Sequence, residues 1–178
     1  KLGFEFENEI QMEIKDEPKN VSIFILTKEK LTAGYSLDEV MKKYSDAFGI
    51  TYFEYASAED SVRAEMEKVI KNISGNTSIP GYEDLLLVGK IRASALSWSH
   101  LKDVFGTVSE KLGADMSASG IYSQLSSENK AQVFKNIREK CANALSIKEI
   151  SDAFESETEN MYYNSQNSSQ SSSGSSGG

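Results

Sequence analysis

The feature that most constrains the fold of this chain is a change in the spacing of its apolar residues. Near the N-terminus apolar residues alternate with glutamates, whereas from residue 82 onward they recur every three or four positions. A period of two is typical of a half-buried β-strand, and a period near 3.6 is typical of an amphipathic helix. We therefore expect an α+β fold, with strands in the N-terminal part and helices in the C-terminal part.

An antiparallel β-hairpin is predicted at residues 10–27. The loop at 16–20 contains Pro18, which fixes the backbone φ angle and is typical of a turn. The apolar run at 21–27 that follows is typical of a strand covered on both faces. The two arms would pair across a five-residue loop.

A third strand is predicted at residues 50–55, because "ITYFEY" is rich in β-branched and aromatic residues. A helix is predicted before it, at 36–49, where Ser36 and Glu39 have capping-box spacing. A second helix is predicted from Ser57, with an apolar stripe that ends near residue 75. The expected order of the N-terminal part is therefore ββαβα.

The loop at 76–82 is a candidate domain boundary, because the pattern after it is helical. Ser126, and Ser146 with Glu149, are expected to cap the last two predicted helices. We predict three regions: an α+β subdomain at 1–75, a helical subdomain at 82–160, and a Ser/Gly-rich flexible tail at 161–178. The end of that tail contains nothing apolar that could offset the entropy of ordering it.

Charge and hydropathy narrow the possible partners. The net charge is −8, and neither half of the chain has the Lys/Arg surplus with which proteins neutralise phosphates, so nucleic acid is disfavoured. No apolar run approaches the length of a membrane span. We expect a cytoplasmic or virion-associated protein. A secreted protein stays open, because the chain begins at Lys1 and a leader could have been removed.

Motifs that carry catalytic chemistry are missing from the sequence. His100 is the single histidine and Cys141 the single cysteine, and no acidic residue stands at a telling distance from either. Gly89–Lys90 lies inside an apolar helical run and does not fit a phosphate-binding loop. We therefore predict no catalytic, cofactor-binding or metal-binding residues and no cofactor. A carboxylate- or tyrosine-based active site remains an alternative, since such groups meet only in the folded chain.

Tyrosines and the tail supply the candidate partner-binding residues. Tyrosine offers a large contact area at low entropic cost, so it is common at protein interfaces. The uncharged tail could add to a neighbouring subunit through its main chain. The predicted partner-binding residues are Tyr52, Tyr55, Tyr162, Tyr163, Ser168, Ser172 and Gly174.

The function predicted from the sequence is that of a non-enzymatic structural or assembly protein. It would act through protein–protein contacts in a homo- or hetero-oligomer, such as a phage or viral particle, with the C-terminal tail docked on a neighbour. The alternative is a regulatory binding module with a helix-turn-helix-like region at 147–163, although the segment that would supply its second helix has no basic residue.

Overall fold

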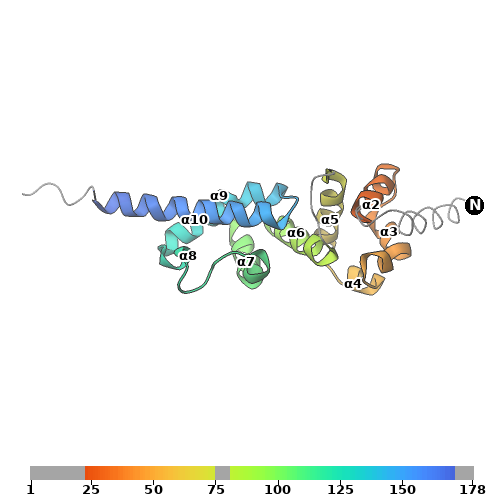
Figure 1. Cartoon of the computed structure of the whole chain (residues 1–178), viewed down its shortest axis with the longest axis horizontal. Helices are drawn as coiled ribbons and strands as arrows, with labels where there is room; N and C mark the ends of the chain where they lie inside the picture. Colours follow the sequence, from red (N-terminus) through yellow and green to blue (C-terminus); the bar gives the residue numbers. More distant parts are fainter. Residues whose placement is uncertain (1–22, 75–80, 171–178) are drawn as a thin grey trace, which may run out of the picture. The chain divides into compact units, whose positions relative to one another are not determined.

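The computed structural model describes residues 23–74 and 81–170, and all of its regular elements are helices (Figure 1). The chain divides into two compact units, Lys1–Tyr82 and Glu83–Gly178. In the first unit the helices are α2 (Ile23–Thr32), α3 (Leu37–Tyr44), the 3-10 helix η1 (Ser45–Phe48), α4 (Tyr52–Ala56) and α5 (Asp60–Asn72). Helix α6 (Tyr82–Ser94) leads into the second unit, which contains α7 (Trp98–Leu112), α8 (Ile121–Gln124), α9 (Ser127–Asn143) and α10 (Ile147–Gln170).

The predicted α+β class is therefore wrong for the described residues, because they contain no strand. The predicted hairpin falls largely on residues 10–22, which lie outside the described part. Its second strand at 21–27 was nevertheless assigned incorrectly, because residues from Ile23 onward belong to α2. The predicted third strand at 50–55 is also wrong, since Tyr52 begins α4.

Helix α2 forms because its apolar run continues into residues that favour a helix. The buried side chains Phe24, Thr27 and Leu31 follow helical spacing, and "KEK" supplies good helix formers between them. Gly34 ends the helical turn with φ of 100°, a left-handed conformation that glycine adopts without steric cost. A short apolar run alone does not distinguish a buried strand from a buried helix, which explains the wrong prediction.

Helix α4 forms because of a capping box that the β-propensity of its residues obscures. The Thr51 hydroxyl accepts a hydrogen bond from the Glu54 N–H at 3.2 Å, and the Glu54 carboxylate accepts one from the Thr51 N–H at 2.6 Å. Both backbone N–H groups would otherwise lack partners at the start of the helix. The β-branched residue that suggested a strand is thus the N-cap of a helix.

Several predicted helical features are confirmed. Ser36 and Glu39 form the predicted capping box at the start of α3. Ser126 caps α9, its hydroxyl accepting the Asn129 N–H at 3.1 Å. The apolar stripe of the second predicted helix is buried along α5 and just after it; its members are Val62, Met66, Val69, Ile70 and Ile73.

The second unit is organised around four buried aromatic rings, one from each of α7, α8, α9 and α10. These are Phe105, Tyr122, Phe134 and Phe154. The centroids of Phe105 and Phe154 lie 4.8 Å apart, and Phe134 meets Phe105 edge-on at 5.4 Å. Such edge-on and offset ring pairs are favoured over face-to-face stacks. The cluster fixes the first half of α10 against the rest of its unit.

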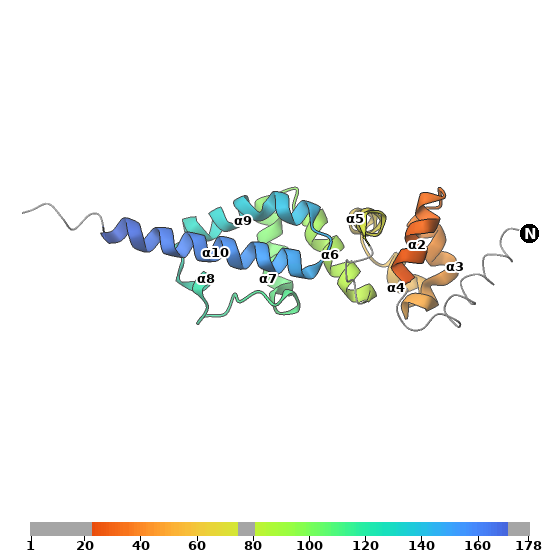
Figure 2. The same ribbon diagram turned by 45° about the horizontal axis from the view of Figure 1, so that its top comes forward.

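Helices α9 and α10 pack side by side as an antiparallel hairpin (Figure 2). The tight turn between them is held by Ser146, whose hydroxyl accepts the Glu149 N–H at 3.2 Å, while the Glu149 carboxylate accepts the Leu145 N–H at 2.9 Å. The buried Arg92 guanidinium donates to the Ala144 carbonyl at 2.9 Å, which satisfies a carbonyl at the end of α9. Figure 1 shows that α10 continues past the start of α9.

The C-terminal region differs from its predicted organisation in one respect. Helix α10 runs without interruption to Gln170, so residues 161–170 of the predicted flexible tail are helical. The same continuity removes the turn that a helix-turn-helix unit at 147–163 requires. Residues 171–178 lie outside the described part of the chain.

Candidate interaction surface on helix α10

The outer half of α10 combines exposed acidic and aromatic side chains with incomplete packing against the rest of the chain. We define residues 159–170 as the α10 extension. The buried side chains of α10 are Ile150, Ala153, Phe154 and Thr158, all of which precede the extension. Of the extension's side chains described up to residue 167, none is buried. The helix therefore continues after its packing within the chain has become incomplete.

The register of the α9–α10 hairpin explains why packing weakens there. The Asn136 amide donates to the Glu157 carboxylate at 2.7 Å, which places these two residues opposite each other. Since α9 begins at Ser127, nine residues before Asn136, α9 reaches only to about residue 166 of α10. The last turn of α10 has no α9 residue opposite it.

Apolar and aromatic side chains are present on the extension despite this incomplete packing. Met161 and Tyr162 are half-buried, and Tyr163 is 59% exposed. The rings of Tyr162 and Tyr163 meet edge-on, with centroids 5.7 Å apart and an interplanar angle of 72°. The extension thus presents an aromatic pair in which Tyr162 is half-buried and the Tyr163 ring is exposed.

The composition of the extension makes its helical state dependent on contacts. Eight of its twelve residues are Asn, Ser or Tyr, which are weak helix formers. Asn and Ser side chains compete for backbone hydrogen bonds, as Ser165 does by donating to the Tyr162 carbonyl at 2.6 Å. A helix of this length and composition has little intrinsic stability in water. It needs either the rest of α10 or an external surface to stay ordered.

Acidic groups follow the exposed side of the helix. Glu155, Glu159 and Tyr163 are separated by four residues each, so they lie along one ridge of α10, and all three are exposed. From Glu149 to the end of α10 there are five acidic residues and no lysine or arginine. The ridge is therefore an acidic surface that ends in an exposed aromatic ring.

The other predicted partner-binding residues lie in different environments. Tyr55 is buried with 2% of its surface exposed, and Tyr52 is half-buried with its hydroxyl donating to Asp38 at 3.0 Å. Ser168 lies within α10, and its side chain is outside the described part. Ser172 and Gly174 lie in residues 171–178, which are not described. Among the predicted residues the structure forms two ring pairs: Tyr162 with Tyr163 on α10, and Tyr52 with Tyr55 on α4, whose ring centroids lie 6.0 Å apart.

Asp38 forms a polar cluster that ties α3, α4 and α5 of the first unit together. Its carboxylate accepts hydrogen bonds from Tyr52 and from Lys42, whose ammonium lies 2.8 Å away, and the Arg63 guanidinium lies at 3.5 Å. The hydrogen bond from Lys42, supported by the Tyr52 hydroxyl and the Arg63 charge, lowers the pKa of Asp38. Tyr52 is thus occupied in packing its own unit.

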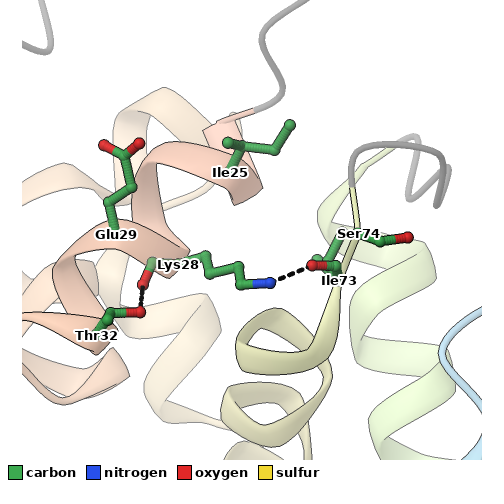
Figure 3. Close-up of a pocket in the computed structure, with 6 residues that line it drawn as sticks. All are labelled: Ile25, Lys28, Glu29, Thr32, Ile73 and Ser74. Carbon is green, nitrogen blue, oxygen red and sulfur yellow. Dashed lines mark hydrogen bonds between the residues drawn. The ribbon is translucent and has the colours of Figure 1, made fainter.

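A pocket of about 440 Å³ lies between α2 and the end of α5 (Figure 3). It is lined by Ile25, Lys28, Glu29, Thr32, Ile73 and Ser74. The Lys28 ammonium donates to the Ile73 carbonyl, where the end of α5 leaves carbonyl groups without helical partners. Lys28 therefore serves as a structural tie between two helices.

The two residues considered for nucleophilic or base chemistry are far from a catalytic arrangement. Cys141 is fully buried in α9, and desolvation raises its pKa to about 12, so it stays a neutral thiol. His100 is exposed on α7. In residues 23–74 and 81–170, no group of three or more His, Cys, Asp or Glu side chains could hold a metal ion.

Two further properties of the described residues are the exposure of single apolar side chains and the length and hydropathy of the helices. Phe53 is 80% exposed and Leu96 is 89% exposed, but single exposed apolar residues are common on protein surfaces. None of the helices in the described ranges is long and apolar enough to cross a membrane.

Comparison with known proteins gives no match: no family model, curated protein or solved structure is significantly similar to this chain.

Sequence reasoning identified the tyrosine pair but missed its neighbours. Glu159 is not among the predicted contact residues, because the prediction rests on tyrosines and on the uncharged tail and includes no acidic residue. The four-residue spacing of Glu155, Glu159 and Tyr163 was a usable signal, since it marks one face of a helix. It could have extended the last helix beyond residue 160.

Proposed function

We propose that this chain is a non-enzymatic interaction protein that joins a larger assembly by docking the α10 extension on another protein. One observation carries the proposal: half of the longest described helix lies beyond the last buried side chain of α10, yet it carries the exposed ring of Tyr163 packed edge-on against the half-buried Tyr162. Surface helices of this kind bind partners by laying one face into a complementary groove.

Burial of the extension's apolar area against a partner is energetically favourable. Tyr162 and Tyr163 present half-exposed and exposed apolar area, and covering such area stabilises an interface by roughly 25 cal/mol per Å². Tyrosine is also among the residues most often found at the energetic centre of interfaces. A partner would thus stabilise the helix and bury the aromatic pair at the same time.

Site-specific photo-crosslinking in the cells that make the protein tests this proposal. A benzophenone amino acid would replace Tyr163, and a matched variant would carry it at Leu96, which is even more exposed and lies in the same unit. We expect one dominant protein adduct from position 163. It should be missing from position 96 and lost when Tyr162→Ser is added.

Two results would contradict the proposal. One is the absence of any protein adduct at position 163, while the probe at position 96 still forms adducts with a test protein that is added to check its reactivity. The other is the same set of adducts from both positions, which would indicate random collision. Retention of the adduct in the Tyr162→Ser variant would remove Tyr162 from the contact.

A further inference from the structure

The partner's chemistry can be inferred from the exposed ridge, on the assumption that the proposed function holds. We propose that the partner protein presents arginine side chains beside an apolar patch, with one guanidinium paired to Glu159 and stacked on Tyr163. These two residues are four positions apart on one helix face, so a single partner side chain can reach both. The apolar patch would cover Tyr162, which lies three residues from Glu159 and therefore beside it on the helix surface.

The carboxylates of α10 differ in whether they have a partner within the described part of the chain. Asp152 is already paired with Lys148, whose ammonium lies 2.6 and 2.8 Å from its two carboxylate oxygens. Glu157 accepts a hydrogen bond from Asn136. Glu159 has no ion pair within residues 23–74 and 81–170, and it is exposed. A cation on the partner would supply the counter-charge that this chain does not provide there.

The same charge pattern argues against a second copy of this chain as the occupant. An extension packed on another extension would bring Glu155 and Glu159 of both copies together, and like charges across an interface are unfavourable. Nucleic acid is disfavoured for the same reason, because the extension has no group that neutralises phosphate. A basic protein surface meets the charge without such repulsion.

Arginine fits this site better than lysine. The guanidinium is planar, stacks on aromatic faces and pairs with a carboxylate through two parallel hydrogen bonds. Tyr163 has an exposed ring and lies beside a carboxylate, so both interactions are offered by neighbouring turns of the helix. This chain already uses the first of them, since the Arg63 guanidinium lies over the Tyr55 ring at 5.5 Å.

Binding of three synthetic helical peptides to the full chain tests the inference. The peptides share one leucine stripe, and the residues that flank it are all Arg, all Lys or all Glu. Calorimetric titration should show binding of the Arg peptide, binding about five- to tenfold weaker for the Lys peptide, and none for the Glu peptide. Affinity for the Arg peptide should fall on raising the salt concentration.

Variants of the full chain assign the binding to the ridge. Glu159→Gln and Tyr163→Ala should each weaken binding of the Arg peptide by about fivefold, because each removes one of the two interactions. Glu110→Gln is the matched control: it removes one exposed carboxylate from α7 and should leave the affinity unchanged. This control separates the ridge from the general attraction of an acidic protein for a basic peptide.

Several outcomes overturn the inference. The first is that the Arg peptide does not bind, and the second is that the Arg and Lys peptides bind with equal affinity. The third is that Glu159→Gln and Glu110→Gln weaken the affinity for the Arg peptide equally. The crosslinking result then decides whether the proposed function falls as well. A single adduct at position 163 that maps to an acidic or uncharged partner surface would leave the proposed function standing and remove the arginine.

Discussion

The two halves of helix α10 have the same backbone conformation but different reasons for it. The first half, residues 147–158, buries Ile150, Ala153, Phe154 and Thr158 against its own unit. The extension buries none of its described side chains and consists mostly of weak helix formers. The difference indicates that the first half serves the fold and that the extension is available for contacts outside the chain.

Core truncation should separate the two halves most clearly. Phe154→Ala removes a ring that packs on Phe105, Tyr122 and Phe134, so we expect a loss of about 3–5 kcal/mol in the free energy of unfolding. The matched substitution Tyr163→Ala in the extension should change it by less than about 0.5 kcal/mol. Urea unfolding followed by circular dichroism measures both. Similar losses for the two variants would contradict the division.

Thiol accessibility should show a similarly large contrast. Burial raises the pKa of Cys141 to about 12, so at pH 8 this thiol should react with a disulfide reagent about a thousandfold more slowly than a free thiol. A cysteine introduced by Tyr163→Cys should react at nearly the free-thiol rate. The raised pKa of Cys141 in the folded state also makes the free energy of unfolding depend on pH. The contribution of this thiol is complete below about pH 9 and is lost as the pH rises toward 12. Rapid labelling of Cys141 in the folded protein would argue against its burial.

Loss of the cap that begins α10 should have an intermediate effect. In Ser146→Ala the Glu149 N–H loses its side-chain acceptor, and we expect a destabilisation of about 1 kcal/mol. The effect should appear in the first half of α10 and not in the crosslinking or peptide-binding behaviour of the extension. Thermal unfolding measures the first part. If Ser146→Ala unfolded normally but no longer bound the Arg peptide, the cap would act on the extension. That result would contradict the separation of the two halves of α10.

The smallest effect is expected from raising the helix propensity of the extension. Asn160→Ala replaces an exposed weak helix former by the best one, which favours the helix locally by about 0.5 kcal/mol. Helical circular dichroism should rise slightly, while the midpoint of urea unfolding should stay unchanged. A shift of that midpoint would show that the extension unfolds together with the core.

The sequence predicts the helices of this protein well wherever polar and apolar residues alternate at helical spacing. The stripe of α5, the Ser126 cap and the Ser36–Glu39 box were all readable, because each is a local pattern with one physical meaning. The wrong predictions at 21–27 and 50–55 come from segments whose composition suits two structures. There the outcome was decided by a continuation into "KEK" and by the Thr51–Glu54 cap.

The candidate site was only partly predictable for a different reason. Tyr162 and Tyr163 stand out in the sequence, but their exposure depends on where α9 begins relative to α10. That register follows from the turn at Ser146 and the pair Asn136–Glu157, which joins residues twenty-one positions apart. Weak helix propensity in the extension also favoured a flexible tail over a helix.

Hydrogen exchange along α10 in the isolated full chain, followed by mass spectrometry of its peptides, tests the division of this helix most directly. Amides of residues 150–158 should exchange only with global unfolding, and those of residues 161–170 should exchange at least about a hundredfold faster through local opening. Equal, high protection of both stretches in the isolated monomer would contradict the account, because the extension would then be held by its own chain and would need no partner.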